Sequence, residues 1–294
     1  MIDSLRHRFD LPGVTFHLHD RLVVMRLENR HGVAELTPLG ATLTSYVPQG
    51  GREVIWVSDT ARFDGSRPVR GGIPVCWPWF GAHPTDPDQR AHGFARLLPW
   101  DIESVTEETE STRAVLRLEP SEETRQQWPH AFVLRLTVTL GPSLRVDLTA
   151  ENLSPEPWTV SEALHTYLRV GESRDLPIDG LESCRYWDKQ AGGRRGVQEQ
   201  PLRLAPPFDR VYFAHPREAV IHDGDRRIRI EKAGSSSTVV WNPGPEGARA
   251  FDDMPDTAWR QMACVETANA LDDAYTLEPD SHHTLTTILS TTSG

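Results

Sequence analysis

Apolar and polar residues alternate with a period of two along most of this chain, and this pattern constrains its fold most strongly. The clearest case is Phe132–Leu140, where every second residue from Phe132 is apolar and the opposite face carries an arginine and two threonines. A second alternating run, Leu144–Ala150, follows after Gly141 and Pro142. Two such runs joined by a short glycine-proline turn are typical of a β-hairpin.

Similar runs recur along the whole chain, and glycines and prolines fall mainly between them, as turns require. Helical signals are sparse, although Ser121 suits a helix N-cap because two glutamates follow it. We therefore expect an all-β protein: a large antiparallel β-sandwich with a few short helices, forming a single domain over residues 1–294. The other predicted strands are Leu22–Leu27, Leu43–Val47, Glu53–Val57, Arg113–Leu118, Leu164–Val170, Arg226–Glu231, Thr238–Trp241, Met262–Ala268 and Thr284–Leu289.

Charge and cysteine content exclude several classes of protein. The formal net charge of −11 opposes non-specific binding to nucleic acid or to an anionic membrane, so we expect neither as a partner. A few arginines in a cleft can still bind a small anion. The three cysteines lie far apart and form no Cys/His cluster with ligand spacing, so we expect no metal and no disulfide framework. The N-terminus lacks an apolar signal sequence, which favours a cytoplasmic location.

Residues 70–100 interrupt the alternation. This segment combines five prolines, four glycines, three tryptophans and three arginines with two histidines. Such a composition favours a long, structured loop that lines a site. Aromatic faces stack on sugar rings, while arginine and histidine donate hydrogen bonds to hydroxyls or phosphate. The alternative is a packed loop with its tryptophans in the core and its arginines in solvent, and composition alone does not decide between the two.

Several motifs in a fixed order add a family resemblance. The segment RGGIPVCWPWFG is followed by HGFAR and PW, then by SEALHTYLRV, FDRVY, WNPG and CVETAN. Together they span roughly residues 35 to 290. The sequence resembles the glucose-6-phosphate 1-epimerase (hexose-6-phosphate mutarotase) branch of the aldose 1-epimerase family. The resemblance implies the galactose mutarotase-like supersandwich, a variant of the β-sandwich expected from the alternation.

The chemistry of that family needs one acid and one base. Mutarotation opens a hemiacetal ring and closes it on the other face, so one group takes the proton of the anomeric hydroxyl while another protonates the ring oxygen. The resemblance implies that Glu266 is the base and His165 the acid, and we expect them a ring's width apart. Strand alternation places each on the face opposite its apolar neighbours, which alone does not distinguish a catalyst from an exposed residue. No cofactor is expected.

The resemblance also implies the residues that bind substrate. Arg70 and Arg96 match positions that contact substrate and can hold a phosphate by forked hydrogen bonds. His92 opens the HGFAR motif, and Asp209 matches a carboxylate that binds sugar hydroxyls. Alternatively, Asp209 is a turn residue, because two prolines precede it. Some relatives carry a glutamine before the histidine where this chain has Ala91, which leaves sugar preference more open than phosphate recognition.

We therefore expect an isomerase that interconverts the α and β anomers of a hexose 6-phosphate, with D-glucose 6-phosphate as the first candidate, and that acts as a monomer. Three alternatives stay open. The chain could act on free aldoses, or bind carbohydrate as a sensor without turnover. It could also be a glycosidase or lyase that uses Asp209 and Glu266 as a carboxylate pair.

Overall fold

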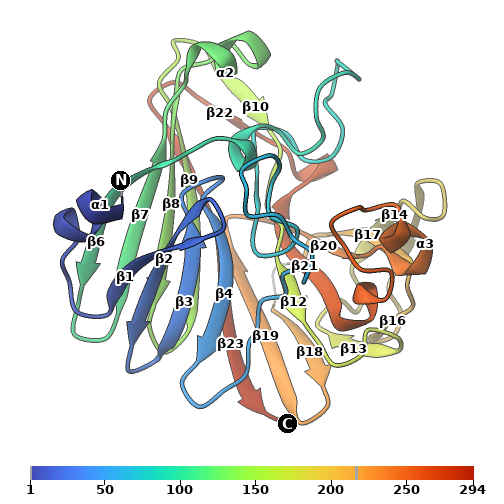
Figure 1. Ribbon diagram of the computed structural model, residues 1–294. Coiled ribbons are helices and arrows are strands. Elements are labelled where there is room, and N and C mark those ends of the chain that lie inside the picture. Colours follow the sequence, from blue (N-terminus) through green and yellow to red (C-terminus); the bar gives the residue numbers. More distant parts are fainter. Residues whose placement is uncertain (1, 216–217) are drawn as a thin grey trace.

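The computed structural model describes residues 2–215 and 218–294, and these residues form an all-β fold with only short helices (Figure 1). The strands make four sheets of nine, eight, four and two strands, and the pairing within each is antiparallel. The predicted all-β antiparallel fold is confirmed.

The nine-stranded sheet is the large layer at the back of Figure 1. The predicted hairpin supplies two of its inner strands, in which Phe132 pairs with Asn152 and Leu140 with Leu144. The side chains that the alternation placed on one face are buried, as expected for a strand with one core-facing side. In sheet order the strands are β16 (Leu202–Leu204), β13 (Leu176–Asp179), β18 (Ala219–Asp223), β19 (Arg226–Ala233), β23 (His282–Ser293), β9 (Leu144–Asn152), β8 (Phe132–Leu140), β7 (Thr112–Leu118) and β6 (Asp101–Glu107).

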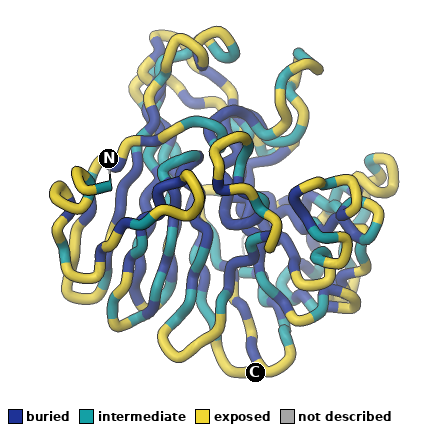
Figure 2. The backbone as a smooth tube through the Cα atoms, viewed as in Figure 1, coloured by how far each residue is buried: buried dark blue, intermediate teal, exposed yellow. Residues whose placement is uncertain are grey.

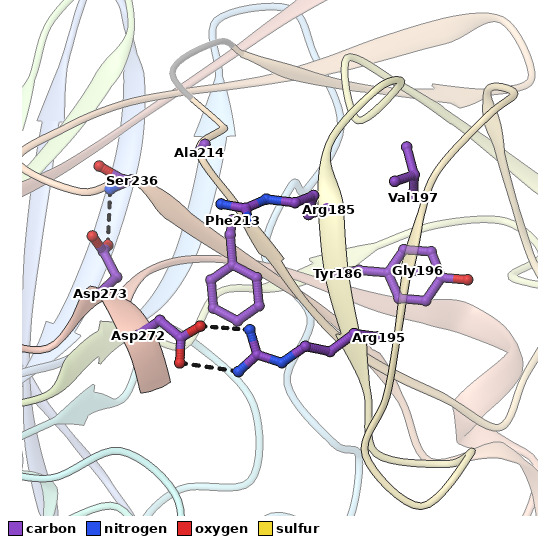
Figure 3. A pocket seen from close by; sticks show the side chains of 10 residues that line it. All are labelled: Arg185, Tyr186, Arg195, Gly196, Val197, Phe213, Ala214, Ser236, Asp272 and Asp273. Carbon is purple, nitrogen blue, oxygen red and sulfur yellow. Dashed lines mark hydrogen bonds and ion pairs between the residues drawn. The ribbon is translucent and has the colours of Figure 1, made fainter.

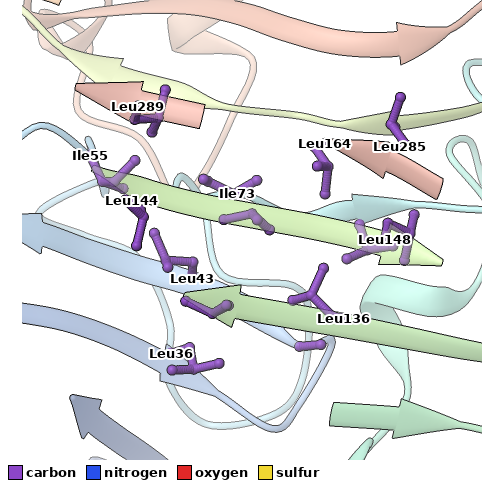
Figure 4. Close-up of a cluster of buried hydrophobic side chains, with 14 of the residues drawn as sticks. Leu36, Leu43, Ile55, Ile73, Leu136, Leu144, Leu148, Leu164, Leu285 and Leu289 are labelled. Carbon is purple, nitrogen blue, oxygen red and sulfur yellow. The ribbon is translucent and has the colours of Figure 1, made fainter. Parts of the chain in front are cut away.

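A four-stranded sheet packs against one half of this layer and closes the core between them (Figures 1 and 2). Leu36 and Leu43 from the small sheet meet Leu136 and Leu148 from the large one, and all four are fully or almost fully buried (Figure 4). Burying a leucine side chain contributes about 1.5–3 kcal/mol, so this interface stabilises the sandwich strongly. The small sheet contains β1 (Val14–His19), β2 (Leu22–Asn29), β3 (Gly32–Thr37) and β4 (Thr42–Pro48).

An eight-stranded sheet extends to the right in Figure 1 and carries many of the polar residues predicted for the site. Its strand β21 pairs with three other strands, and all eight of its residues are buried. The path runs through β15 (Arg194–Val197), β14 (Arg185–Asp188), β17 (Phe208–Phe213), β20 (Ser237–Asn242), β21 (Met262–Asn269), β11 (Glu162–Leu164) and β5 (Val75–Cys76), with β12 (Tyr167–Arg169) paired to β21. The remaining pair is β10 (Trp158–Val160) with β22 (Tyr275–Leu277).

The helices are short and lie at the edges of the sheets. Ser121 caps α2 as predicted, because its hydroxyl accepts a hydrogen bond from the Thr124 amide at 3.2 Å. Among the described residues, no helix has both the length and the apolar character needed to cross a membrane. The helices are α1 (Ile2–Arg8), α2 (Glu122–Gln127) and α3 (Gly244–Arg249), with single 3₁₀ turns η1 (Ala95–Leu97), η2 (Ala258–Gln261) and η3 (Leu271–Asp273).

Two of the predicted strands are wrong. Glu53–Val57 makes only isolated bridges, at Ile55 and Val57. The run Leu164–Val170 is split, because β11 ends at Leu164 and β12 begins at Tyr167. At the break, the amide of His165 donates to the Pro74 carbonyl at 3.1 Å. A distant segment therefore interrupts the strand at the predicted catalytic histidine.

Glu162 on β11 is a buried carboxyl group outside any predicted site. Its residue is fully buried, and Nε2 of His283 lies 3.6 Å from Oε1. Burial lowers the pKa of His283, so this ring favours its neutral form. Burial raises the pKa of Glu162 to about 8, and the nearby hydroxyl of Tyr275 offsets only part of this shift. The folded state therefore binds more protons than the unfolded state between about pH 4.5 and 8, and ionisation of Glu162 destabilises the fold as the pH rises through that window.

Replacing Glu162 by Gln should therefore increase the free energy of unfolding, and the increase should grow with pH. We expect the gain at pH 8 to exceed the gain at pH 5 by about 1 kcal/mol or more, since each unit of pKa shift corresponds to about 1.4 kcal/mol. Urea denaturation of both proteins at the two pH values measures the difference. An equal change in stability at pH 5 and pH 8 would show that this carboxyl group ionises as easily in the folded as in the unfolded chain.

Candidate active site

All six residues predicted for the site line one cleft of about 570 Å³. The eight-stranded sheet supplies its floor through β17, β20 and β21, while the segment 70–100 and the chain after α3 supply its walls. Residues far apart in the sequence thus converge, as expected where loops are positioned by a rigid sheet. The six predicted residues are Arg70, His92, Arg96, His165, Asp209 and Glu266.

Each of the two competing interpretations of the segment 70–100 holds in part. Its tryptophans, Trp77, Trp79 and Trp100, are buried in the core. Its polar residues Arg70, His92 and Arg96 face the cleft instead. The aromatic residues therefore anchor the loop, and the anchored loop presents cationic and imidazole side chains at the cleft.

His165 and Glu266 are in direct contact at the floor of the cleft. Nε2 of His165 lies 3.4 Å from Oε1 of Glu266, and their side chains are 10% and 1% exposed. The expectation that a ring's width separates them is therefore wrong. Contact suits the chemistry better, because the anomeric oxygen and the ring oxygen of a sugar are bonded to the same carbon.

Burial determines the charge state of this pair. It is the main cause that raises the pKa of Glu266 well above its ordinary value, and the carboxylate of Asp209 adds to the effect. Burial is also the main cause that lowers the pKa of His165, with further contributions from His92 and Arg96. Both groups thus favour their neutral forms, so the resting pair holds one proton between them.

Aromatic neighbours fix the ring of His165. Tyr167 stacks on it with a centroid distance of 4.8 Å and an interplanar angle of 14°. Trp241 meets the same ring edge-on at 5.9 Å. These contacts restrict ring rotation, so Nε2 stays directed at Glu266.

His92 is a neutral hydrogen-bond donor. Its backbone lies in the left-handed region, with a φ of 68°, and its amide donates to the Gly81 carbonyl at 2.7 Å. Nδ1 accepts from the Gly81 amide at 3.3 Å. Burial, together with Arg96 and Lys189, lowers the pKa of His92 to about 3. A neutral ring that accepts at Nδ1 carries its proton on Nε2, so His92 offers one donor and no charge.

The two predicted anion-binding arginines differ in how far their charge is neutralised. Arg70 donates from Nε to the buried carboxylate of Asp253 at 2.9 Å. Arg96 donates from Nη2 to the carbonyl of Ala91 at 2.9 Å, and its buried Nε has no hydrogen-bond partner among the described residues. Arg96 therefore keeps its positive charge available for a ligand. Ala91 acts here through its backbone alone, which a glutamine at that position would equally provide.

Asp209 and Lys189 also line the cleft and form an ion pair there. Asp209 is a strand residue in β17, so its interpretation as a turn residue is wrong. Burial raises its pKa, and the ammonium of Lys189, 3.4 Å from Oδ2, partly offsets that effect. Sequence reasoning missed Lys189 because it follows β14 outside every recognised motif.

One group of side chains in the cleft has the geometry of a metal site. The ligand atoms of His165, Cys264 and Glu266 all lie within 4.8 Å of one another. Burial, assisted by Glu266, raises the pKa of the Cys264 thiol well above its ordinary value, and the pKa of Glu266 is raised as well. Metal ligands must be deprotonated, so a metal ion bound here would have to displace the protons of the thiol and of the carboxyl group.

A second hollow of about 480 Å³ lies beside β14 and β17 (Figure 3). Arg195 and Asp272 face each other across it and make two hydrogen bonds of 2.6 and 3.1 Å, which neutralise both charges. No histidine occurs among the described residues that line this hollow. The predicted acid–base pair, His165 and Glu266, lies in the first cleft.

The family model described as aldose 1-epimerase matches residues 23–290 of this chain. The chain belongs to the aldose 1-epimerase family. It is accordingly an epimerase, an enzyme of the isomerase class.

One similar protein comes from Escherichia coli strain K12 and is named "putative glucose-6-phosphate 1-epimerase". It is 35% identical over 254 residues, which cover 85% of this chain and 84% of that protein.

Solved structures agree with this family assignment. A structure from Salmonella typhimurium described as a "putative mutarotase (YeaD)" superposes with a TM-score of 0.90 at 30% identity, covering 97% of this chain and 95% of that one. A galactose mutarotase-like protein from Clostridium acetobutylicum shares the fold, with a TM-score of 0.73 at 15% identity and coverages of 96% and 98%. The predicted galactose mutarotase-like fold is confirmed.

Proposed function

We propose that this chain interconverts the α and β anomers of a hexose 6-phosphate, with D-glucose 6-phosphate as the first substrate to test. The observation that carries the proposal is the contact of 3.4 Å between His165 and Glu266 in a cleft that also holds Arg96 with its charge available. The name of the Escherichia coli relative supports the same substrate.

The proposed reaction begins with Glu266 as the base. Its carboxylate takes the proton of the anomeric hydroxyl, the oxygen forms a double bond to C1, and the bond from C1 to the ring oxygen breaks. His165 donates a proton to that ring oxygen. Rotation about C1–C2 and the reverse steps then give the other anomer. The catalytic form, with Glu266 ionised and His165 protonated, differs from the neutral resting pair only in the position of the shared proton.

The same scheme accounts for the remaining groups of the cleft. Asp209 accepts hydrogen bonds from sugar hydroxyls, and His92 donates one. The ring of Trp241 offers an apolar face for the sugar. Arg70 and Arg96 bind the phosphate, so a local positive charge offsets the net charge of −11. Hemiacetal and open-chain aldehyde have the same oxidation state, so the scheme requires no redox cofactor.

Location and assembly are also proposals. We propose the cytoplasm, because the three cysteines form no disulfide framework, as is usual in a reducing compartment. We propose a monomer, because one chain supplies every residue of the acid–base pair and the phosphate site. A glycosidase is disfavoured, because Asp209 is paired with Lys189 and the cleft offers a histidine in contact with Glu266.

Replacing Arg96 by Ala tests the phosphorylated substrate. Charge-assisted hydrogen bonds contribute about 1.5–3 kcal/mol, so kcat/KM for glucose 6-phosphate should fall about 10- to 100-fold. The value for free glucose should stay within about threefold, because free glucose has no phosphate to lose contact with. Anomer exchange measured on both sugars by NMR gives the two ratios. Equal losses on both sugars would contradict phosphate binding by Arg96.

A further inference from the structure

The guanidinium group of Arg70 is held by the segment that follows α3. Nε donates to Oδ1 of Asp253 at 2.9 Å, and the guanidinium carbon lies 4.1 Å from the ring centre of Phe251. Arg70 and Tyr167 also both line the cleft. The side chain of Asp253 is only 1% exposed, so this contact is shielded from water. We name Asp253 and Phe251 the Arg70 clamp.

The clamp leaves part of Arg70 available to a ligand. A guanidinium group has five N–H donors, and the ion pair with Asp253 uses the one on Nε. Arg70 lines the cleft, whereas Asp253 does not. Asp253 can therefore influence a ligand in the cleft through the arginine that it holds.

The neighbouring residue Asp252 makes a contrasting set of contacts. Its side chain is 61% exposed and pairs with Arg62 at 3.4 Å and with Arg67. Residues 62–70 and the segment after α3 are thus joined by an exposed contact at Asp252 and a buried contact at Asp253. Only the buried contact reaches an arginine of the cleft, so Asp252 provides a matched control for its neighbour.

We propose that Asp253 is a positioning residue for substrate binding, which aims the remaining N–H groups of Arg70 at the substrate phosphate. The proposal rests on the proposed function, because it assigns the phosphate to Arg70. An arginine side chain has several freely rotating bonds, and fixing it before the ligand arrives removes part of the entropic cost of binding. The stacked ring of Phe251 restrains the plane of the guanidinium group in the same way.

The Asp253 carboxylate could act on the phosphate through its charge or by holding Arg70 in place, and these two roles predict opposite changes in phosphate binding. If the carboxylate acts only through its charge, its removal leaves Arg70 more positive and phosphate binds more tightly. If it acts by holding Arg70 in place, its removal weakens phosphate binding. Asp253→Asn separates the two effects, because an amide oxygen can still accept the hydrogen bond from Nε while the negative charge is lost.

The test compares Asp253→Ala, Asp253→Asn and Asp252→Ala by anomer exchange on glucose 6-phosphate and on free glucose. We expect Asp253→Ala to raise KM for glucose 6-phosphate about tenfold or more, with a smaller change in kcat and little change on free glucose. Asp253→Asn and Asp252→Ala should both stay within about threefold of the parent protein. A KM unchanged in Asp253→Ala, or lowered in Asp253→Asn, would overturn the proposal.

Two further measurements separate loss of the clamp from a failure to fold and from a failure of the proposed function. If Asp253→Ala does not fold, Phe251→Leu tests the clamp from its other side. Because Phe251 also lines the cleft, the comparison is between the two sugars: KM for glucose 6-phosphate should rise about threefold more than KM for free glucose. Equal changes on both sugars would count against the clamp. Calorimetric binding of glucose 6-phosphate separates the clamp from the proposed function. A parent protein that binds but does not turn over contradicts the function alone, and weaker binding by Asp253→Ala then still supports the clamp. A parent protein that does not bind contradicts both.

Discussion

Replacing Glu266 by Gln should slow anomer exchange in glucose 6-phosphate by about 10²- to 10⁴-fold, the usual contribution of a general acid or base. Glutamine has nearly the same shape but cannot accept the proton of the anomeric hydroxyl. The fold should tolerate the change, because burial raises the pKa of Glu266 and so favours an uncharged group at this position. Exchange measured by NMR at saturating substrate reports the loss in kcat.

Glu162→Gln is the matched control for this experiment. Glu162 is also a fully buried glutamate with a raised pKa, on the strand next to β21, but it lies outside the cleft. We expect it to leave exchange within about twofold of the parent protein. Glu266→Gln should also keep its affinity for glucose 6-phosphate in a calorimetric titration. Exchange at the parent rate would remove Glu266 from the mechanism.

Replacing His165 by Asn should cause a loss of similar size, about 10²- to 10⁴-fold in kcat, because the ring oxygen then lacks its proton donor. The double variant with Glu266→Gln should be little slower than either single variant, since the two groups share one proton and act as a unit. Single losses that multiply in the double variant would contradict a shared proton.

His92→Asn provides the comparison for His165. The two rings are neighbours, with centroids 5.7 Å apart, but burial lowers the pKa of His92 to about 3 and the proposed scheme gives it no proton to transfer. We expect this variant to raise KM while kcat changes by less than about tenfold. A loss in kcat as large as that of His165→Asn would require a catalytic role for His92.

The period-two alternation predicted the fold well, because each strand of the sandwich has one face in the core. Phe132–Leu140 has the same bounds in the sequence pattern and in the structure. The alternation failed at Leu164–Val170, where the Pro74 carbonyl takes the amide of His165 and ends the strand. That partner lies 91 residues earlier in the chain, so no local pattern indicates it.

The ordered motifs predicted which residues meet in the cleft, but not how they meet. Alternation placed Glu266 opposite its apolar neighbours and could not tell a buried cleft from solvent. Its contact with His165, and the pKa shifts that follow from burial, depend on how β21 and the break after β11 lie in the folded chain. Lys189 contacts Asp209 in the cleft, and Asp253 contacts Arg70. Both lie in turns without a recognisable sequence pattern, so only the structure identifies them.

Two-dimensional exchange NMR on glucose 6-phosphate tests the central claim most directly, because it measures the rate at which the α and β anomers interconvert at equilibrium. We predict exchange many times faster with the parent protein than in buffer, loss of that acceleration in Glu266→Gln, and weaker acceleration of free glucose under the same conditions. Exchange no faster than in buffer would contradict the assignment of this cleft to hexose 6-phosphate mutarotation, and equal acceleration of both sugars would contradict the phosphate preference.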